Sequence, residues 1–315
     1  MTLGPLLVIG GAEDKTGRGA ILARFVRLAG GAQARIAVVA TASALGEEIV
    51  EVYREVFGKL GVAVVRAPRP SNRSEAADPA LVAELTEATG IFMTGGNQTK
   101  LSAVVTGTPF GEAIKAAHAR GIVVGGTSAG ASVQSEHMVA FGREGATPKL
   151  RMSHLSAGLG LLQGVVVDQH FEQRNRYGRL LTLVCHSPHL LGIGVDEDTA
   201  GLVTDGHVLE VLGRGAITVF DGSAMISNVD TASGTAPLLA SGVVLHSMPA
   251  GSRFDLTTRT LLPAAGGQPD DLRDTLSAAA PTRLAGRKRL DKLIATEGVL
   301  GDLPRIRKTA KKRPT

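Results

Sequence analysis

Short, nearly continuous apolar segments alternate with amphipathic segments along roughly the first 200 residues of the chain. The apolar segments are rich in β-branched residues, which is typical of strands that are covered on both faces. They lie at Leu6–Ile9, Ile36–Ala40, Val62–Val65, Gly90–Met93, Ile122–Val124 and Val165–Val167. The segments between them predict helices over Gly19–Leu28, Glu47–Leu60, Pro79–Ala88, Lys100–Thr106 and Gly111–Ala119. This alternation predicts an α/β fold in which a mostly parallel sheet is flanked by helices.

From about Gly192 onward the pattern changes to short strands separated by turn-forming residues. These strands are predicted at Gly201–Val203, His207–Leu212, Ala216–Asp221 and Val243–Ser247. We interpret them as antiparallel additions to the same domain, which then spans residues 1–277. The remainder, residues 278–315, is a basic C-terminal extension.

The composition narrows the class of protein. Hydrophobic residues make up 43% of the 315 residues and charged residues 20%, as in soluble globular proteins. With no Trp, two Tyr and eight Phe, the chain is poorly suited to a binding face of stacked aromatic rings. The single cysteine, Cys185, excludes an internal disulfide and a multi-thiolate metal site. The apolar run before Gly10 is too short for a signal peptide, and no run approaches the ~20 apolar residues of a membrane span. We therefore expect a soluble, cytoplasmic protein.

The net charge of +5 is unevenly distributed along the chain. Residues 283–313 hold eleven Lys or Arg and three acidic residues, whereas the rest of the chain holds 23 basic and 26 acidic residues. Such a tail is typical of a solvated, partly disordered terminus, which we favour, or of a segment that binds a polyanion such as nucleic acid.

The most informative segment begins in the strand predicted at Ile122–Val124. Its sequence Gly126-Thr-Ser128-Ala-Gly130 has the Gly-X-Ser-X-Gly spacing of a nucleophile elbow. Glycines permit the sharp turn that presents the serine hydroxyl at the amino end of the next helix. The positive end of that helix and the backbone N–H of Ala129 would stabilise a tetrahedral oxyanion. The alternative interpretation is a Gly/Ser turn without chemistry.

A serine nucleophile needs a base and an acid that orients the base. Among eight histidines, His170 is the one that directly follows a predicted buried strand, so we expect it at the sheet edge where Ser128 lies. Two acids are candidates: Glu197, in the acidic cluster at 196–198, and Glu144, in a Gly-Arg-Glu-Gly loop. Spacing does not decide between them, because triad partners meet in space and not in sequence.

Further polar residues follow two of the predicted strands. In Thr94-Gly-Gly-Asn-Gln98, the Gly96 N–H is a candidate second oxyanion donor, and Gln98 is placed to hydrogen-bond a substrate backbone. Three arginines follow His170, at Arg174, Arg176 and Arg179. Any one of them would suit a solvated helix face. Together, they predict a cluster that reads carboxylates, since guanidinium groups bind carboxylates bidentately.

Four stretches resemble the cyanophycinase family of serine peptidases, which is related to aspartyl dipeptidase (peptidase E). They are Thr94–Gln98, Gly125–Ser132, Asp168–Phe171 with the three arginines, and Gly192–Glu197. The resemblance covers roughly residues 4–275. It implies a class I glutamine amidotransferase-like (flavodoxin-like) three-layer sandwich, a homodimer, and no metal or organic cofactor.

The resemblance also implies an activity: hydrolysis of cyanophycin, multi-L-arginyl-poly-L-aspartate, from its end to β-Asp-Arg dipeptides. Ser128 would be the nucleophile and His170 the general base, with Glu197 as the preferred acid and Glu144 as the alternative. The positions that match the family's substrate pocket are Gln98, Asp168, Gln169, Arg174, Arg176 and Arg179. Each Asp-Arg pair of the polymer offers a carboxylate to the arginines and a guanidinium to acids such as Asp168. We expect no membrane or nucleic-acid partner.

Other activities fit the residues less well. An α-aspartyl dipeptidase on the same scaffold is the nearest alternative, but a dipeptide has fewer carboxylates for three arginines to read. A noncatalytic polyanion-binding protein would be expected to have lost part of the triad. An amidotransferase would need a cysteine at the elbow, and Cys185 does not lie there.

Overall fold

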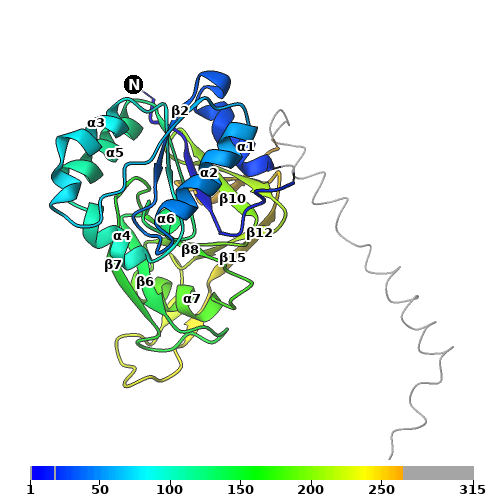
Figure 1. The fold of residues 1–315 in the computed structure, drawn as a ribbon. Coiled ribbons are helices and arrows are strands. Elements are labelled where there is room, and N and C mark those ends of the chain that lie inside the picture. The colour runs from blue at the N-terminus through cyan, green and yellow to red at the C-terminus, as the bar shows by residue number, and fades with distance from the viewer. Residues whose placement is uncertain (1, 18, 265–315) are drawn as a thin grey trace, which may run out of the picture. The chain divides into compact units, whose positions relative to one another are not determined.

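Figure 1 shows the fold of the computed structural model, which describes residues 2–17 and 19–264. Its largest element is a nine-stranded sheet. Across this sheet the strands are β17 (Thr260–Leu262), β16 (Arg253–Asp255), β11 (Val208–Gly213), β10 (Thr199–Thr204), β1 (Leu6–Ile9), β5 (Val123–Thr127), β4 (Gly90–Met93), β2 (Arg35–Val39) and β3 (Val64–Arg66). The half from β1 to β3 is parallel and the half from β10 to β17 is antiparallel. The predicted α/β architecture with a mostly parallel core is confirmed. The predicted extension at 278–315 and its boundary lie outside the described residues.

The register of the parallel strands determines which loops meet. Ile9 at the end of β1 lies opposite Thr127 at the end of β5, and Met93 of β4 lies opposite Gly126. The backbone link continues one residue further, where the Ser128 N–H donates to the carbonyl of Ile9 at 2.9 Å. The loops that follow these three strands therefore emerge together at one edge of the sheet.

Helices cover both faces of this sheet (Figure 1). On one face, α1 (Ala20–Leu28) and α2 (Glu47–Lys59) pack on the strands through an aromatic cluster of Phe25, Tyr53, Phe57 and Phe92. The ring centroids in this cluster lie 4.9 to 5.9 Å apart. A chain with ten Phe and Tyr residues thus concentrates four of them in one half of its core.

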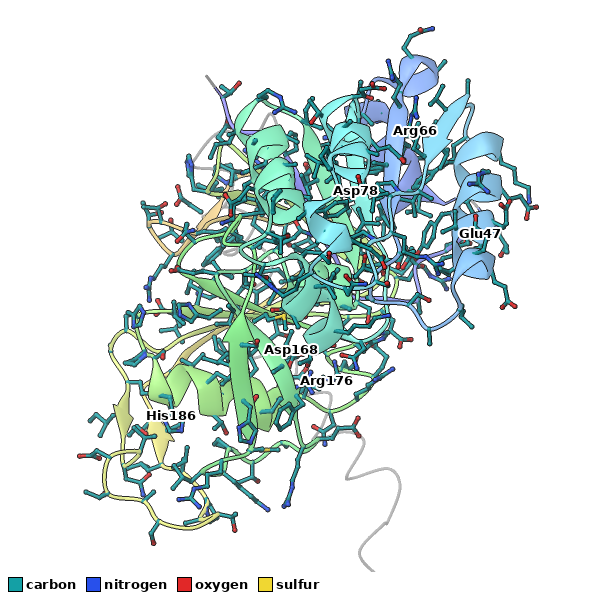
Figure 2. All side chains as sticks on the ribbon, turned by 60° about the vertical axis from the view of Figure 1, so that its left-hand side comes forward. Glu47, Arg66, Asp78, Asp168, Arg176 and His186 are labelled. Carbon is teal, nitrogen blue, oxygen red and sulfur yellow. The ribbon has the colours of Figure 1, made fainter. Side chains whose placement is uncertain are left out.

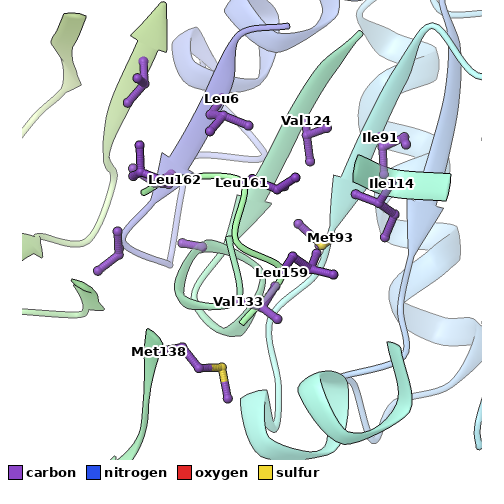
Figure 3. Close-up of a cluster of buried hydrophobic side chains, with 14 of the residues drawn as sticks. Leu6, Ile91, Met93, Ile114, Val124, Val133, Met138, Leu159, Leu161 and Leu162 are labelled. Carbon is purple, nitrogen blue, oxygen red and sulfur yellow. The ribbon is translucent and has the colours of Figure 1, made fainter. Parts of the chain in front are cut away.

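The other face carries α3 (Pro79–Thr86), α4 (Gln98–Val105) and α5 (Pro109–Ala119). Figure 3 shows part of the core beneath them, in which Leu6, Ile91 and Val124 project from the strands and Ile114 of α5 lies beside Ile91. The starts of these helices follow from local chemistry. The side chains of Asp78, Asn97 and Thr108 each accept a hydrogen bond from a backbone N–H in the first turn. Proline occupies the first position of α3 and of α5.

The strand predicted at Val165–Val167 was expected to belong to the same sheet, and this is wrong. It is β8 (Val165–Gln169), which belongs to a second, four-stranded sheet. This sheet has the order β15 (Val244–Pro249), β12 (Ala216–Asp221), β9 (Leu191–Val195) and β8. The helix α7 (Tyr177–His186) packs on it through Leu180, Leu183 and Val184. The apolar pattern identifies β8 as a buried strand but carries no information about which neighbour it pairs with.

The remaining elements are short. The elbow helix is α6 (Ala129–Ser132), and a hairpin of β6 (His137–Gly142) and β7 (Ser153–Ala157) forms a separate sheet. The others are β13 (Ile226–Ser227), β14 (Ala240–Ser241), η1 (Gly31–Gln33) and η2 (Glu75–Ala77). None of the helices in the described part of the chain is both long and apolar enough to cross a membrane.

Candidate active site

Ser128 occupies a strained turn between β5 and α6. Its backbone has φ 53° and ψ −110°, and such a positive φ is rare for serine and is often found at active sites. The flanking glycines make the turn possible. A Cβ on Gly126 would lie 2.1 Å from the carbonyl oxygen of Gly130, so no larger residue fits there. The Gly-X-Ser-X-Gly spacing of the sequence is therefore required by the close approach of two backbone segments.

His170 follows β8 and comes to Ser128 from the second sheet. Its Nε2 lies 3.0 Å from Ser128 Oγ. The loop after β1 holds the histidine in place, because the His170 N–H donates to the carbonyl of Gly10 at 2.8 Å. The ring lies so close to this loop that a Cβ on Gly11 would be 2.2 Å from His170 Cε1. Gly10 and Gly11 thus couple the two sheets at the candidate site.

Glu197 completes a hydrogen-bonded chain. Its Oε1 lies 2.6 Å from His170 Nδ1, an arrangement that places the ring proton on Nδ1 and leaves Nε2 free to accept from the serine. Glu197 is itself held by its backbone N–H, which donates to Gln173 Oε1 at 2.9 Å. The structure brings Glu197, and not Glu144, into contact with His170. Glu144 lies instead within electrostatic range of Arg176.

The surroundings of His170 favour its neutral form. Burial lowers the pKa of the imidazole below its ordinary value, and the positive charges of Arg174 and Arg176 lower it further. The hydrogen bond and charge of Glu197 act in the opposite direction but do not reverse the shift. A neutral imidazole hydrogen-bonded to a serine hydroxyl is the state that a general base requires.

Two backbone N–H groups near Ser128, those of Gly96 and Ala129, were predicted to stabilise an oxyanion. A Cβ on Gly95 would lie 3.3 Å from Ser128 Cβ, so the Gly95–Gly96 turn packs directly against the serine. Gly96 has φ 138° and its Cβ position lies 2.2 Å from the carbonyl oxygen of Ala42, which makes glycine necessary here as well. Within residues 2–17 and 19–264, neither Gly96 N–H nor Ala129 N–H has a hydrogen-bond acceptor. Both are therefore available to a ligand.

Asp168 forms the centre of a buried charge cluster with Arg176 and Arg179. Figure 2 shows Asp168 and Arg176 close together. Its side chain is 0% exposed. Arg179 binds both of its oxygens, through Nε at 2.6 Å and through a second guanidinium nitrogen, and Arg176 approaches it at 3.4 Å. The direct contact between Asp168 and a substrate guanidinium, expected from the sequence, does not match this geometry, because the carboxylate is already occupied. Asp168 instead positions the two arginines.

The three arginines after His170 differ in their surroundings. Arg176 and Arg179 are buried, at 7% and 3% exposure, whereas Arg174 is exposed. Burial is the main reason that the pKa of Arg176 falls to about 10, a shift that the charge of Asp168 opposes. Among them, Arg174 is the one that solvent, and hence a substrate carboxylate, reaches most directly.

Gln169 contacts both the charge cluster and Ser128, whereas Gln98 contacts the β6–β7 hairpin. Arg176 donates to the Gln169 carbonyl at 2.5 Å and to Gln169 Oε1 at 2.8 Å. The same Oε1 lies 3.5 Å from Ser128 Oγ, so Gln169 connects the charge cluster to the serine. Gln98 Nε2 donates to the carbonyl of Val139 in the β6–β7 hairpin at 2.9 Å.

A cavity of about 350 Å³ adjoins Ser128. It is lined by Glu13, Lys15 and Tyr53, which were not predicted from the sequence as site residues. Glu13, which is 3% exposed, accepts hydrogen bonds from Tyr53 Oη at 2.6 Å and from Thr127 Oγ1 at 2.5 Å, and pairs with Lys15 at 2.8 Å. This carboxylate therefore braces the residue that precedes Ser128. The signal was present, since Gly10-Gly11-Ala12-Glu13 follows β1 in the same way that the other site residues follow their strands.

A serine hydroxyl hydrogen-bonded to a histidine, whose second nitrogen binds a carboxylate, is the arrangement typical of serine hydrolases. The family model "Peptidase family S51" matches residues 6–211, and the chain belongs to this family of serine-type peptidases. Two curated relatives, the cyanophycinases of Geminocystis herdmanii and of a Nostoc species, are each 38% identical to it. The first alignment covers 83% of this chain and 96% of the relative, and the second covers 82% and 88%.

A solved structure supports the same fold. The crystal structure of a peptidase from an acI-B1 Actinobacterium superposes with a TM-score of 0.58 at 22% identity, covering 78% of this chain and 98% of the other. At this identity the match bears on the architecture alone. It agrees with the mostly parallel sheet and flanking helices described above.

Proposed function

We propose that this protein hydrolyses cyanophycin from its end and releases β-Asp-Arg dipeptides. The observation that carries the proposal is the hydrogen-bonded chain from Ser128 through His170 to Glu197, in a protein 38% identical to two cyanophycinases over more than four fifths of its length. The exposed Arg174 beside this chain suits a polymer that carries one free carboxylate in each Asp-Arg unit.

In this proposal Ser128 Oγ attacks the scissile carbonyl carbon while His170 Nε2 takes the hydroxyl proton. The negative charge that develops on the carbonyl oxygen is stabilised by the N–H groups of Gly96 and Ala129. His170 then gives its proton to the leaving amine, which leaves an ester between the substrate acyl group and Ser128. Water, deprotonated by His170, hydrolyses this ester and restores the serine. Glu197 stabilises the imidazolium in both halves of the reaction.

The test is to incubate the purified full chain, without added metal, with insoluble cyanophycin and to follow clearing together with β-Asp-Arg release. Ser128→Ala serves as the control and is expected to lose on the order of 10⁶-fold in kcat while retaining its fold. Release by the wild type alone supports both substrate and nucleophile. Cleavage of α-aspartyl dipeptides without action on cyanophycin would mean that the enzyme is a dipeptidase and not a cyanophycinase. Activity in Ser128→Ala would mean that Ser128 is not the nucleophile.

The expected homodimer and cytoplasmic location belong to this proposal as well. The homodimer rests on the resemblance to cyanophycinases, and the location rests on the single cysteine and the short apolar runs of the sequence. Sedimentation of the full chain at several concentrations measures the first. Fractionation of cells that express it measures the second.

A further inference from the structure

Phe141 differs from every other phenylalanine in the protein. The other seven are at most 4% exposed, whereas Phe141 is 60% exposed. It lies on β6, directly after an irregularity in the β6–β7 register between Val139 and Phe141. Such bulges redirect a side chain and are common beside active sites. An exposed aromatic ring in a chain so poor in aromatic residues needs an explanation.

The ring lines a cavity of about 530 Å³, together with Gly96 and Gln98. This cavity, which we call the Phe141 pocket, shares Gly96 and Ala44 with the cavity that adjoins Ser128. The hydrogen bond from Gln98 Nε2 to the carbonyl of Val139 ties the hairpin to this wall. A substrate that reaches Ser128 past the Gly95–Gly96 turn therefore has the Phe141 pocket within reach of its next group.

The chemistry of the lining selects the kind of group that fits. The described lining is made of Ala, Gly, Asn, Gln, Thr and Phe, without a charged side chain. A carboxylate would find no cation there. A guanidinium would find an aromatic face on which to stack, and an amide oxygen to which it can donate. His154 stacks on Phe141 with centroids 4.4 Å apart and an interplanar angle of 26°, which holds the ring in place from one side.

We propose that Phe141 is a platform for the guanidinium of a substrate arginine, with Gln98 Oε1 as its hydrogen-bond acceptor. Within the described residues Gln98 Oε1 has no donor, so it is available for this bond. The inference rests on the proposed function, because cyanophycin carries one arginine on each aspartate. It divides recognition between two places: Arg174 for the carboxylate and the Phe141 pocket for the guanidinium.

The experiment compares two soluble oligomers that differ only in the end group of one side chain. One carries β-linked arginine, and the other carries citrulline, in which a neutral urea replaces the guanidinium. The variants are Phe141→Leu, which keeps an apolar side chain without a π face, and Phe141→Trp, which keeps the π face. Rates of dipeptide release give kcat and KM for the wild type and each variant on each of the two oligomers. Melting curves of the full chain report whether each variant is folded.

We expect the wild type to prefer the arginine oligomer and Phe141→Leu to raise its KM about 5- to 30-fold, with kcat little changed. The KM for the citrulline oligomer should rise far less. The preference for arginine over citrulline should therefore be lost in Phe141→Leu and retained in Phe141→Trp. Equal losses on both oligomers, or an unchanged preference in Phe141→Leu, would overturn the platform. Failure of the folded wild type to release any dipeptide would instead overturn the proposed function, which keeps the two outcomes distinguishable.

Discussion

The nine-stranded sheet supplies Ser128 from the end of β5, whereas the four-stranded sheet supplies His170 and Glu197 from the ends of β8 and β9. Different interactions hold these two parts of the site in place. Around Ser128, backbone segments approach so closely that only glycine fits at 126 and at 96. Around His170, close packing on Gly11 is joined by the hydrogen bond to Glu197 and by the buried charges of Asp168 and Arg179. Substitution by a larger residue should therefore do the most damage on the serine side, and removal of a charge should do the most damage on the histidine side.

The largest expected effect on the histidine side comes from Glu197→Gln. The amide would favour the wrong imidazole tautomer and could not stabilise the imidazolium, so kcat should fall by about 10⁴-fold. Glu144→Gln is the matched control, because Glu144 does not contact His170, and it should retain nearly full activity. Steady-state rates of dipeptide release measure both. A large loss in Glu144→Gln with little loss in Glu197→Gln would reverse the assignment of the acid.

Asp168→Asn should destabilise the fold more than it alters the chemistry. Removing the buried carboxylate leaves Arg179 and Arg176 without their anion, which costs about 3–5 kcal/mol for a broken buried pair. Urea unfolding of the full chain measures this loss. The control is Glu55→Gln, which removes an exposed pair with Lys59 and is expected to leave the unfolding midpoint almost unchanged. Equal midpoints for Asp168→Asn and the wild type would show that the cluster does not hold this region together.

Asp168 also shows where sequence reasoning reached its limit. The strands, the elbow and the strand-end placement of His170 could be predicted, because apolar periodicity and strand-end placement are local signals. These signals left Glu197 and Glu144 open as the acid, and only the family resemblance favoured Glu197. The pairing of β8 with β9 rather than with the main sheet depends on contacts between distant segments, and no local pattern records it. Burial is likewise a tertiary property. Three arginines in six residues look alike in the sequence, yet two of them are enclosed and one is exposed.

On the serine side, Gly126→Ala tests the steric argument. The added methyl group would meet the Gly130 carbonyl at 2.1 Å and force the elbow apart, which should cost about 1–3 kcal/mol in stability and displace Ser128. Gly58→Ala is the control, since its Cβ would meet nothing within 4 Å in α2. That substitution should stabilise the helix by about 0.5–1 kcal/mol. Urea unfolding and the rate of dipeptide release are measured for both variants. If Gly126→Ala were as stable and as active as Gly58→Ala, the steric argument would be wrong.

The smallest expected effect is a shift in pH dependence, and it isolates the electrostatic part of the histidine side. The charge of Arg174 helps to hold the pKa of His170 below its ordinary value, so Arg174→Gln should raise that pKa. His170 must be neutral to act as a base, and the acid limb of kcat/KM follows its titration in the free enzyme. The limb should therefore move to higher pH in Arg174→Gln, with more activity lost at pH 5.5 than at pH 8.

The control is Arg143→Gln, which removes another exposed arginine that does not contribute to the pKa of His170. Its acid limb should coincide with that of the wild type. Because Arg174 is exposed, added salt should screen its charge and move the wild-type limb toward that of Arg174→Gln. A loss in kcat/KM that is equal at every pH would mean that Arg174 acts on the substrate alone, and that burial and the enclosed Arg176 account for the lowered pKa of His170.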